Sequence, residues 1–261
     1  MKISITLALS LLLSQANAQV GLVPFASRAQ QSIPKKASRC LEDKRVNYGG
    51  NFKAHNYTYF CPFYSFEYHG ETSTKWDFLN PIDIMQIAPT LFPIKKKVER
   101  QIQDYAGATF FSRLEFSSVD VVYVDSVKKF EGRMPEVDMR ICRAKYYFFY
   151  MFRADAQAVY NIGFAVNEKG LIISSYDFPS KDYYRPIDTT LTVCTVLQIA
   201  KKANPKLGPI DNVTFDYDAK AKRFYWIVSQ SIQHKHAGIN KFNLVLIDAA
   251  KPSIVKKQQG E

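Results

Sequence analysis

The alternation of apolar and polar residues divides most of the chain into two stretches with the same order of elements. Each stretch begins with a helical pattern, in which apolar residues recur every three or four positions, and continues with strand patterns, in which they recur every second position. Ala144-Lys145 in the first stretch corresponds to Ala221-Lys222 in the second, and a turn at Asn167 corresponds to one at Asp248. This correspondence predicts an internal repeat.

Both predicted helices are amphipathic. The first spans residues 93–106, with Pro93 at its first position. The second spans residues 190–203, with Thr189 or Thr190 as its N-cap. The apolar stripe on each helix predicts that it covers one face of a sheet.

The predicted strands are rich in aromatic residues. The longest covers residues 139–153 and is apolar on both faces, so either both faces are covered or the rings line a groove. Strands are predicted at residues 114–128, 139–153, 159–167 and 171–176 in the first stretch, and at 211–218, 223–231, 241–248 and 253–257 in the second.

Together these patterns predict an α+β fold of two tandem units, each a helix on a four-stranded antiparallel sheet. An N-terminal extension precedes them, with an aromatic strand or hairpin at residues 56–69 and an irregular lead-in before it. The predicted domains are a signal peptide at residues 1–18, the extension at 19–92, a first unit at 93–189 and a second unit at 190–261.

The N-terminus has the three parts of a secretory signal peptide. Lys2 supplies a positive charge, residues 3–13 are apolar, and Ala16-Asn17-Ala18 is a small-residue cleavage site. Residues 19–261 contain no apolar stretch long enough to span a membrane. We therefore predict cleavage near Ala18 and export to the periplasm, the cell surface or the medium, with no transmembrane segment in the mature chain.

The charge of the chain is strongly positive, at +11. Residues 190–261 hold a large share of it, with 11 Lys and Arg against 5 Asp and Glu. In an exported protein this charge favours a protein partner or an anionic component of the envelope, and export argues against a nucleic acid. A lysine-rich, solvated surface is the alternative interpretation.

Four cysteines stand in a chain that is predicted to be exported, where disulfides form. Cys40 and Cys61 enclose a short loop in the extension, so this spacing makes them the preferred pair. Cys142 and Cys194 begin a strand and a helix, and the expectation for both is a buried free thiol.

Three apolar segments follow the helix of the second stretch, namely Phe224–Val228, Leu244–Ala250 and Ile254-Val255. A helix followed by such a meander resembles the PepSY-like, cystatin-like modules of exported bacterial proteins. The resemblance covers most of the second stretch and, more weakly, the first. Lys251-Pro252-Ser253 departs from the family pattern, which has a glycine in the final turn. The resemblance implies a non-catalytic binding or inhibitory module that acts on a protein or a peptidase.

Two sets of residues are candidates for binding. His234-Lys235-His236 lies in the longer loop of the second stretch and could offer two metal ligands, but no third ligand stands nearby, so we predict no metal site and no cofactor. The aromatic strand recurs in both stretches, which favours a structural core over a pocket. The aromatic candidates are Tyr146, Tyr150, Tyr225 and Trp226.

No catalytic motif of the GxSxG, HExxH, P-loop or GxGxxG type occurs in the chain. We therefore predict a non-catalytic exported binding module for a protein, a peptidase or an envelope component. The alternative is a small-molecule-binding protein or hydrolase with a pocket between the two units, lined by the four aromatic candidates. A packed seam between the units would favour the binding module.

Overall fold

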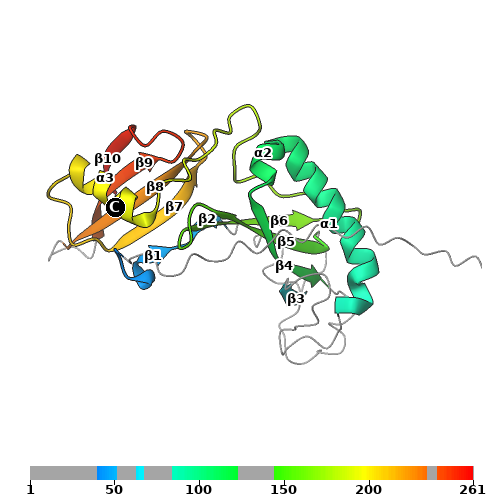
Figure 1. The fold of residues 1–261 in the computed structure, drawn as a ribbon. Coiled ribbons are helices and arrows are strands. Elements are labelled where there is room, and N and C mark those ends of the chain that lie inside the picture. Colours follow the sequence, from blue (N-terminus) through cyan, green and yellow to red (C-terminus); the bar gives the residue numbers. More distant parts are fainter. Residues whose placement is uncertain (1–39, 52–62, 68–83, 123–143, 234–239, 261) are drawn as a thin grey trace, which may run out of the picture. The chain divides into compact units, whose positions relative to one another are not determined.

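Helices and sheets both contribute to the fold, which was obtained as a computed structural model that describes residues 40–51, 63–67, 84–122, 144–233 and 240–260 (Figure 1). Within these ranges the chain forms three α-helices and two mixed five-stranded sheets, which confirms the predicted α+β class. The helices are α1 (Ile84–Ala106), α2 (Ala108–Phe111) and α3 (Val193–Ala203), and a short 3-10 helix covers Asp43–Arg45.

The second sheet agrees closely with the sequence pattern. Its strand order is β1-β7-β8-β9-β10, and the last four strands form an antiparallel meander, as predicted. Helix α3 packs its buried residues, among them Val196 and Leu197, against β8 and β9. The strands are β1 (Val46–Asn47), β7 (Asn212–Asp218), β8 (Arg223–Gln233), β9 (Asn240–Asp248) and β10 (Val255–Gly260).

The first sheet differs from the predicted four-stranded antiparallel unit. Its order is β2-β6-β5-β4-β3, in which β4, β5 and β6 form the meander and the extension supplies both outer strands. The predicted strand at 171–176 makes only one bridge, between Val166 and Ile172. The strands are β2 (Gly49–Asn51), β3 (Phe63–Glu67), β4 (Leu114–Val122), β5 (Tyr146–Arg153) and β6 (Val159–Val166).

Helix α1 begins at Ile84, so the prediction that the helix starts at Pro93 was wrong. Pro89 and Pro93 lie inside the helix, both on its exposed side. Ala88 and Leu91 on the opposite side are buried and continue the apolar stripe. Burial of this stripe therefore outweighs the backbone hydrogen bonds that the two prolines remove.

Helix α3 begins at Val193, and its N-cap is Thr192 instead of the predicted Thr189 or Thr190. The Thr192 hydroxyl accepts a hydrogen bond from the Thr195 amide, and the Thr195 hydroxyl accepts one from the Thr192 amide. This reciprocal capping box satisfies two amides that the first turn would otherwise leave without a partner.

The described strands of the extension belong to both sheets, so residues 46–51 are not part of an irregular lead-in as predicted. Strand β1 pairs in parallel with β7, and β2 pairs in parallel with β6. Gly49 and Gly50 lie where the chain passes from one sheet to the other. A Cβ on Gly49 would stand 1.8 Å from the Phe215 carbonyl oxygen. A Cβ on Gly50 would stand 2.2 Å from the Asn161 carbonyl oxygen. The close approach of these backbones requires glycine at both positions.

A disulfide joins Cys40 to Cys194, over a sequence separation of 154 residues. The predicted Cys40–Cys61 pair and the expectation of a free thiol at Cys194 were therefore wrong. Cys61 and Cys142 lie outside the described residues. The bond links the beginning of the described extension to the first turn of α3, a long-range partnership that sequence spacing does not reveal.

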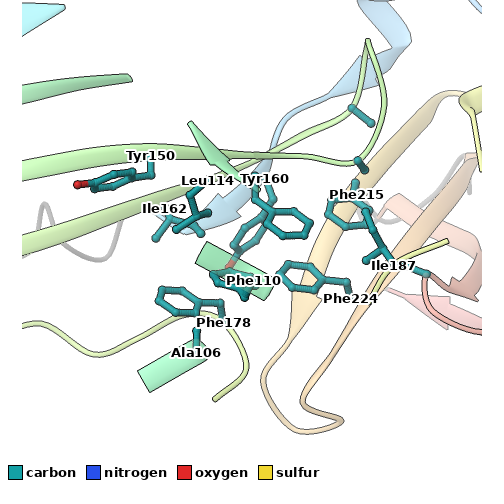
Figure 2. Close-up of a cluster of buried hydrophobic side chains, with 14 of the residues drawn as sticks. Ala106, Phe110, Leu114, Tyr150, Tyr160, Ile162, Phe178, Ile187, Phe215 and Phe224 are labelled. Carbon is teal, nitrogen blue, oxygen red and sulfur yellow. The ribbon is translucent and has the colours of Figure 1, made fainter. Parts of the chain in front are cut away.

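The buried residues of both sheets form one continuous core of mainly aromatic side chains. Phe152 of β5 lies 5.0 Å from Phe110 of α2 and 5.0 Å from Phe224 of β8, measured between ring centroids. All three rings are nearly parallel. Figure 2 shows Phe178 next to Phe110, and Phe215 next to Phe224, in the same cluster. This cluster packs the seam between the two predicted units.

Candidate functional site

The segment from Tyr176 to Asp188, which we call the connector, links the two predicted units and carries the candidate site. It has no helix or strand, yet it is held at several points. The Lys181 amide donates to the Tyr105 carbonyl over 2.8 Å, and the Asp188 amide donates to the Ala249 carbonyl over 2.7 Å. Phe178 is fully buried. The connector therefore has a defined position on the fold.

Three partly exposed tyrosines lie along one side of the connector. Tyr105 of α1 stacks on Tyr176 with 4.1 Å between the ring centroids. Tyr217 of β7 interacts electrostatically with Tyr105, and burial raises the pKa of Tyr217 to about 12. Burial also raises the pKa values of Tyr105 and Tyr176. These hydroxyls therefore stay neutral near pH 7 and can both donate and accept hydrogen bonds.

Arg185, Lys222 and Arg223 surround a small depression beside the connector, which we call the cationic hollow. Its volume is about 10 Å³, room for one water molecule. The Lys222 ammonium lies 3.6 Å from the ring centroid of Tyr183, a cation–π contact. The lining consists of Pro179, Tyr184, Arg185, Ile187, Lys222, Arg223, Phe224, Asp248 and Ala250.

The single carboxylate in the hollow is already bonded. Asp248 is 1% exposed, and one of its oxygens accepts from Arg223 Nη1 over 2.7 Å. The other oxygen accepts from the backbone amides of Ala250 and Lys251. The hydrogen bond from Arg223 to Asp248 and the negative charge of Asp248 raise the pKa of Arg223. The ion pair fixes the Arg223 guanidinium at the edge of the hollow.

The residues that line the hollow limit the kind of group that it can hold. Its lining has no Ser, Thr, Cys or His, and its one carboxylate is already bonded to Arg223 and to two backbone amides. What it presents is positive charge beside the exposed ring of Tyr183. Such a surface can accept an anionic group and an apolar neighbour.

The four aromatic residues predicted to bind lie in buried positions. Tyr146 and Tyr150 face the core from β5, and Trp226 faces it from β8. The Tyr150 hydroxyl has no hydrogen-bond partner among the described residues, and burial raises its pKa. Tyr225 lies in β8 on the face opposite Trp226, and its hydroxyl accepts from Lys256 over 3.2 Å. His234, Lys235 and His236 lie outside the described residues.

Sequence reasoning treated residues 177–189 only as a connector and so missed Tyr183 and Arg185. The available signal was the Asp-Tyr-Tyr-Arg-Pro run, which places aromatic and cationic residues together in a loop. Lys222 ends the β7–β8 turn and Arg223 begins β8, so they lie 37 and 38 positions further along the chain than Arg185. Only the fold brings these residues to one hollow.

The described residues offer neither a cluster of metal ligands nor a membrane-spanning helix. They contain no group of three His, Cys, Asp or Glu side chains that could hold a metal ion. In those same ranges, no helix combines the length and the apolar character needed to cross a bilayer.

Comparison with known proteins gave no match: no protein-family model, no curated protein and no solved structure is significantly similar to this chain. The PepSY-like resemblance of the second stretch therefore stays a prediction.

Proposed function

We propose that this protein is a non-catalytic, exported binding module that engages a protein partner through the connector and the cationic hollow. The observation that carries the proposal is one shallow depression lined by Arg185, Lys222 and Arg223, with the exposed ring of Tyr183 in contact with Lys222. Tyrosine and arginine are the residues that most often dominate the binding energy of protein interfaces.

The proposed architecture is two tandem PepSY-like units, completed at their edges by the extension. Each unit begins with a helix and continues with an antiparallel meander, which supports a common plan. The signal-peptide pattern at the N-terminus supports export. The Cys40–Cys194 disulfide is consistent with an oxidising compartment.

The rival function, a hydrolase or small-molecule-binding protein, needs a pocket between the units. Sites for small ligands occupy about 300–1,000 Å³. The hollow holds about 10 Å³, and aromatic rings pack the seam where the rival places its pocket. These observations favour a binding surface rather than a cavity that encloses a substrate.

A photo-crosslinking experiment tests the proposal. A benzoylphenylalanine at position 183 is compared with one at position 171, because Tyr183 and Leu171 have nearly equal exposures of 50% and 52%. Both variants are exposed to an envelope or extracellular fraction of the source organism. We expect a discrete adduct from position 183 and none from position 171.

The partner identified in this way is then purified, and its affinity is measured for the wild type and for Tyr183→Ala. We expect at least a tenfold loss of affinity, since removal of a dominant interface residue has an effect of this size. Equal crosslinking at both positions, together with turnover of a small substrate by the purified protein, would contradict the proposal.

A further inference from the structure

The cationic hollow has an excess of positive charge that the fold does not balance. Its lining carries Arg185, Lys222 and Arg223 against the one carboxylate of Asp248. That carboxylate is bonded to Arg223 and to two backbone amides. Among the described residues, neither Arg185 nor Lys222 forms an ion pair. Two cations at the hollow therefore have no anionic partner within the described chain.

Hydrogen bonds hold the Arg185 side chain and the turn that precedes Lys222. Arg185 Nη1 donates to the carbonyls of Asp182 and Tyr184 over 3.2 and 3.0 Å. The turn before Lys222 is closed by Asp218, whose carboxylate accepts from the amides of Lys220 and Ala221. A receptor that is arranged before binding loses less conformational entropy when the ligand arrives.

The dimensions of the hollow restrict what can enter it. A volume of about 10 Å³ is room for one water molecule, so a ligand group pairs with the cations at the mouth of the hollow and no small molecule is enclosed. A carboxylate is flat and has two oxygens, which match the parallel N–H groups of a guanidinium. Arg223 already makes one such hydrogen bond with Asp248.

We propose that the hollow is a receptor for an aspartate or glutamate carboxylate on an acidic segment of a protein partner. The incoming carboxylate pairs with Arg185 and Lys222, while the exposed ring of Tyr183 packs against the residues beside it. This inference rests on the proposed binding function and specifies the chemistry of the partner.

The test uses the full mature chain and a simple probe. Backbone amide signals are followed by NMR during titration with acetyl-Gly-Glu-Gly-amide and, separately, with acetyl-Gly-Gln-Gly-amide at equal ionic strength. We expect saturable shifts at Arg185, Lys222 and Arg223 with the glutamate peptide only. Equal shifts with both peptides, or none with either, would overturn the proposal.

A pair of double variants separates the hollow from general positive charge. Arg185→Gln with Lys222→Gln is compared with Lys201→Gln and Lys202→Gln, which remove the same charge from the exposed end of α3. We expect about a tenfold loss of affinity for the glutamate peptide in the first variant, the size expected for charged hydrogen bonds. The second variant should bind like the wild type, and an equal loss in both would refute the assignment.

Two further probes test other anionic ligands. A heparin fragment and phosphatidylglycerol-containing vesicles are titrated in the same way. If either shifts the hollow amides while the glutamate peptide does not, the carboxylate proposal is wrong even though a site exists. If the glutamate peptide binds but no adduct forms at position 183, the proposed function fails and the carboxylate site stands.

Discussion

Gly49 and Gly50 show how single residues control the way in which the extension meets the two sheets. Gly50 has φ +114° and lies against the backbone of Asn161 in β6, while Gly49 lies against Phe215 in β7. The pair is visible in the sequence, where it contributes to the prediction of an irregular lead-in. Its contact partners lie more than 100 residues away, so its role depends on tertiary structure.

We predict that Gly50→Ala destabilises the protein more than Gly107→Ala. Both positions have positive φ, at +114° and +84°, so both substitutions introduce backbone strain. Only at Gly50 would the new Cβ also meet backbone atoms, whereas at Gly107 the nearest atom is a lysine Cβ at 3.4 Å. The expected extra loss in the free energy of unfolding is about 1–3 kcal/mol, measured by urea denaturation. Equal losses would mean that φ alone makes glycine necessary.

The elements follow the sequence pattern well where tertiary contacts agree with it. The burial of alternate residues in β7 reproduces the predicted strand pattern. A turn forms at Asn167–Gly170, but the strand predicted after it makes only one bridge. Strand β5 buries every residue on one face, whereas on its other face Tyr147 is buried and Phe149 and Met151 are partly exposed. The observed starts of α1 and α3 differ from the predicted ones. Packing and capping fix the end of a helix, and several residues near each predicted start could act as the first residue or the N-cap.

We predict that Thr192→Ala destabilises α3, whereas Thr189→Ala does not. Thr192 is the observed N-cap with a reciprocal hydrogen bond to Thr195, while Thr189 is exposed and precedes the cap. Loss of an N-cap hydroxyl costs about 1 kcal/mol. Thermal and urea unfolding of the two variants measure the difference. A larger effect at Thr189 would contradict Thr192 as the N-cap and would favour the start predicted from the sequence, at Thr189 or Thr190.

At the scale of the whole molecule, the Cys40–Cys194 bond and the aromatic seam join parts that are far apart in sequence. The bond connects the extension to α3, and the rings of Phe110, Phe152 and Phe224 connect α2, β5 and β8. Neither connection appears in local patterns. The core is therefore shared between the two predicted units, although each unit has its own sheet.

We predict that Cys194→Ser lowers the free energy of unfolding by about 2–5 kcal/mol, because the bond restricts a very long loop in the unfolded chain. Cys61→Ser is the control and should leave the Cys40–Cys194 bond intact. Peptide mapping without reduction identifies the bonded pair, and urea denaturation gives the stability. A Cys40–Cys61 peptide in the wild type would contradict the structure.

The sequence by itself determined the local features of this protein: the α+β class, the four-stranded meander of the second unit and the aromatic strand β5. These features follow from the spacing of apolar residues, a pattern that is complete within each helix or strand. Tertiary structure alone decided the cysteine pairing, the edge strands supplied by the extension and the meeting of Arg185 with Lys222 and Arg223. Each of these depends on the closure of a long loop, which no local pattern encodes.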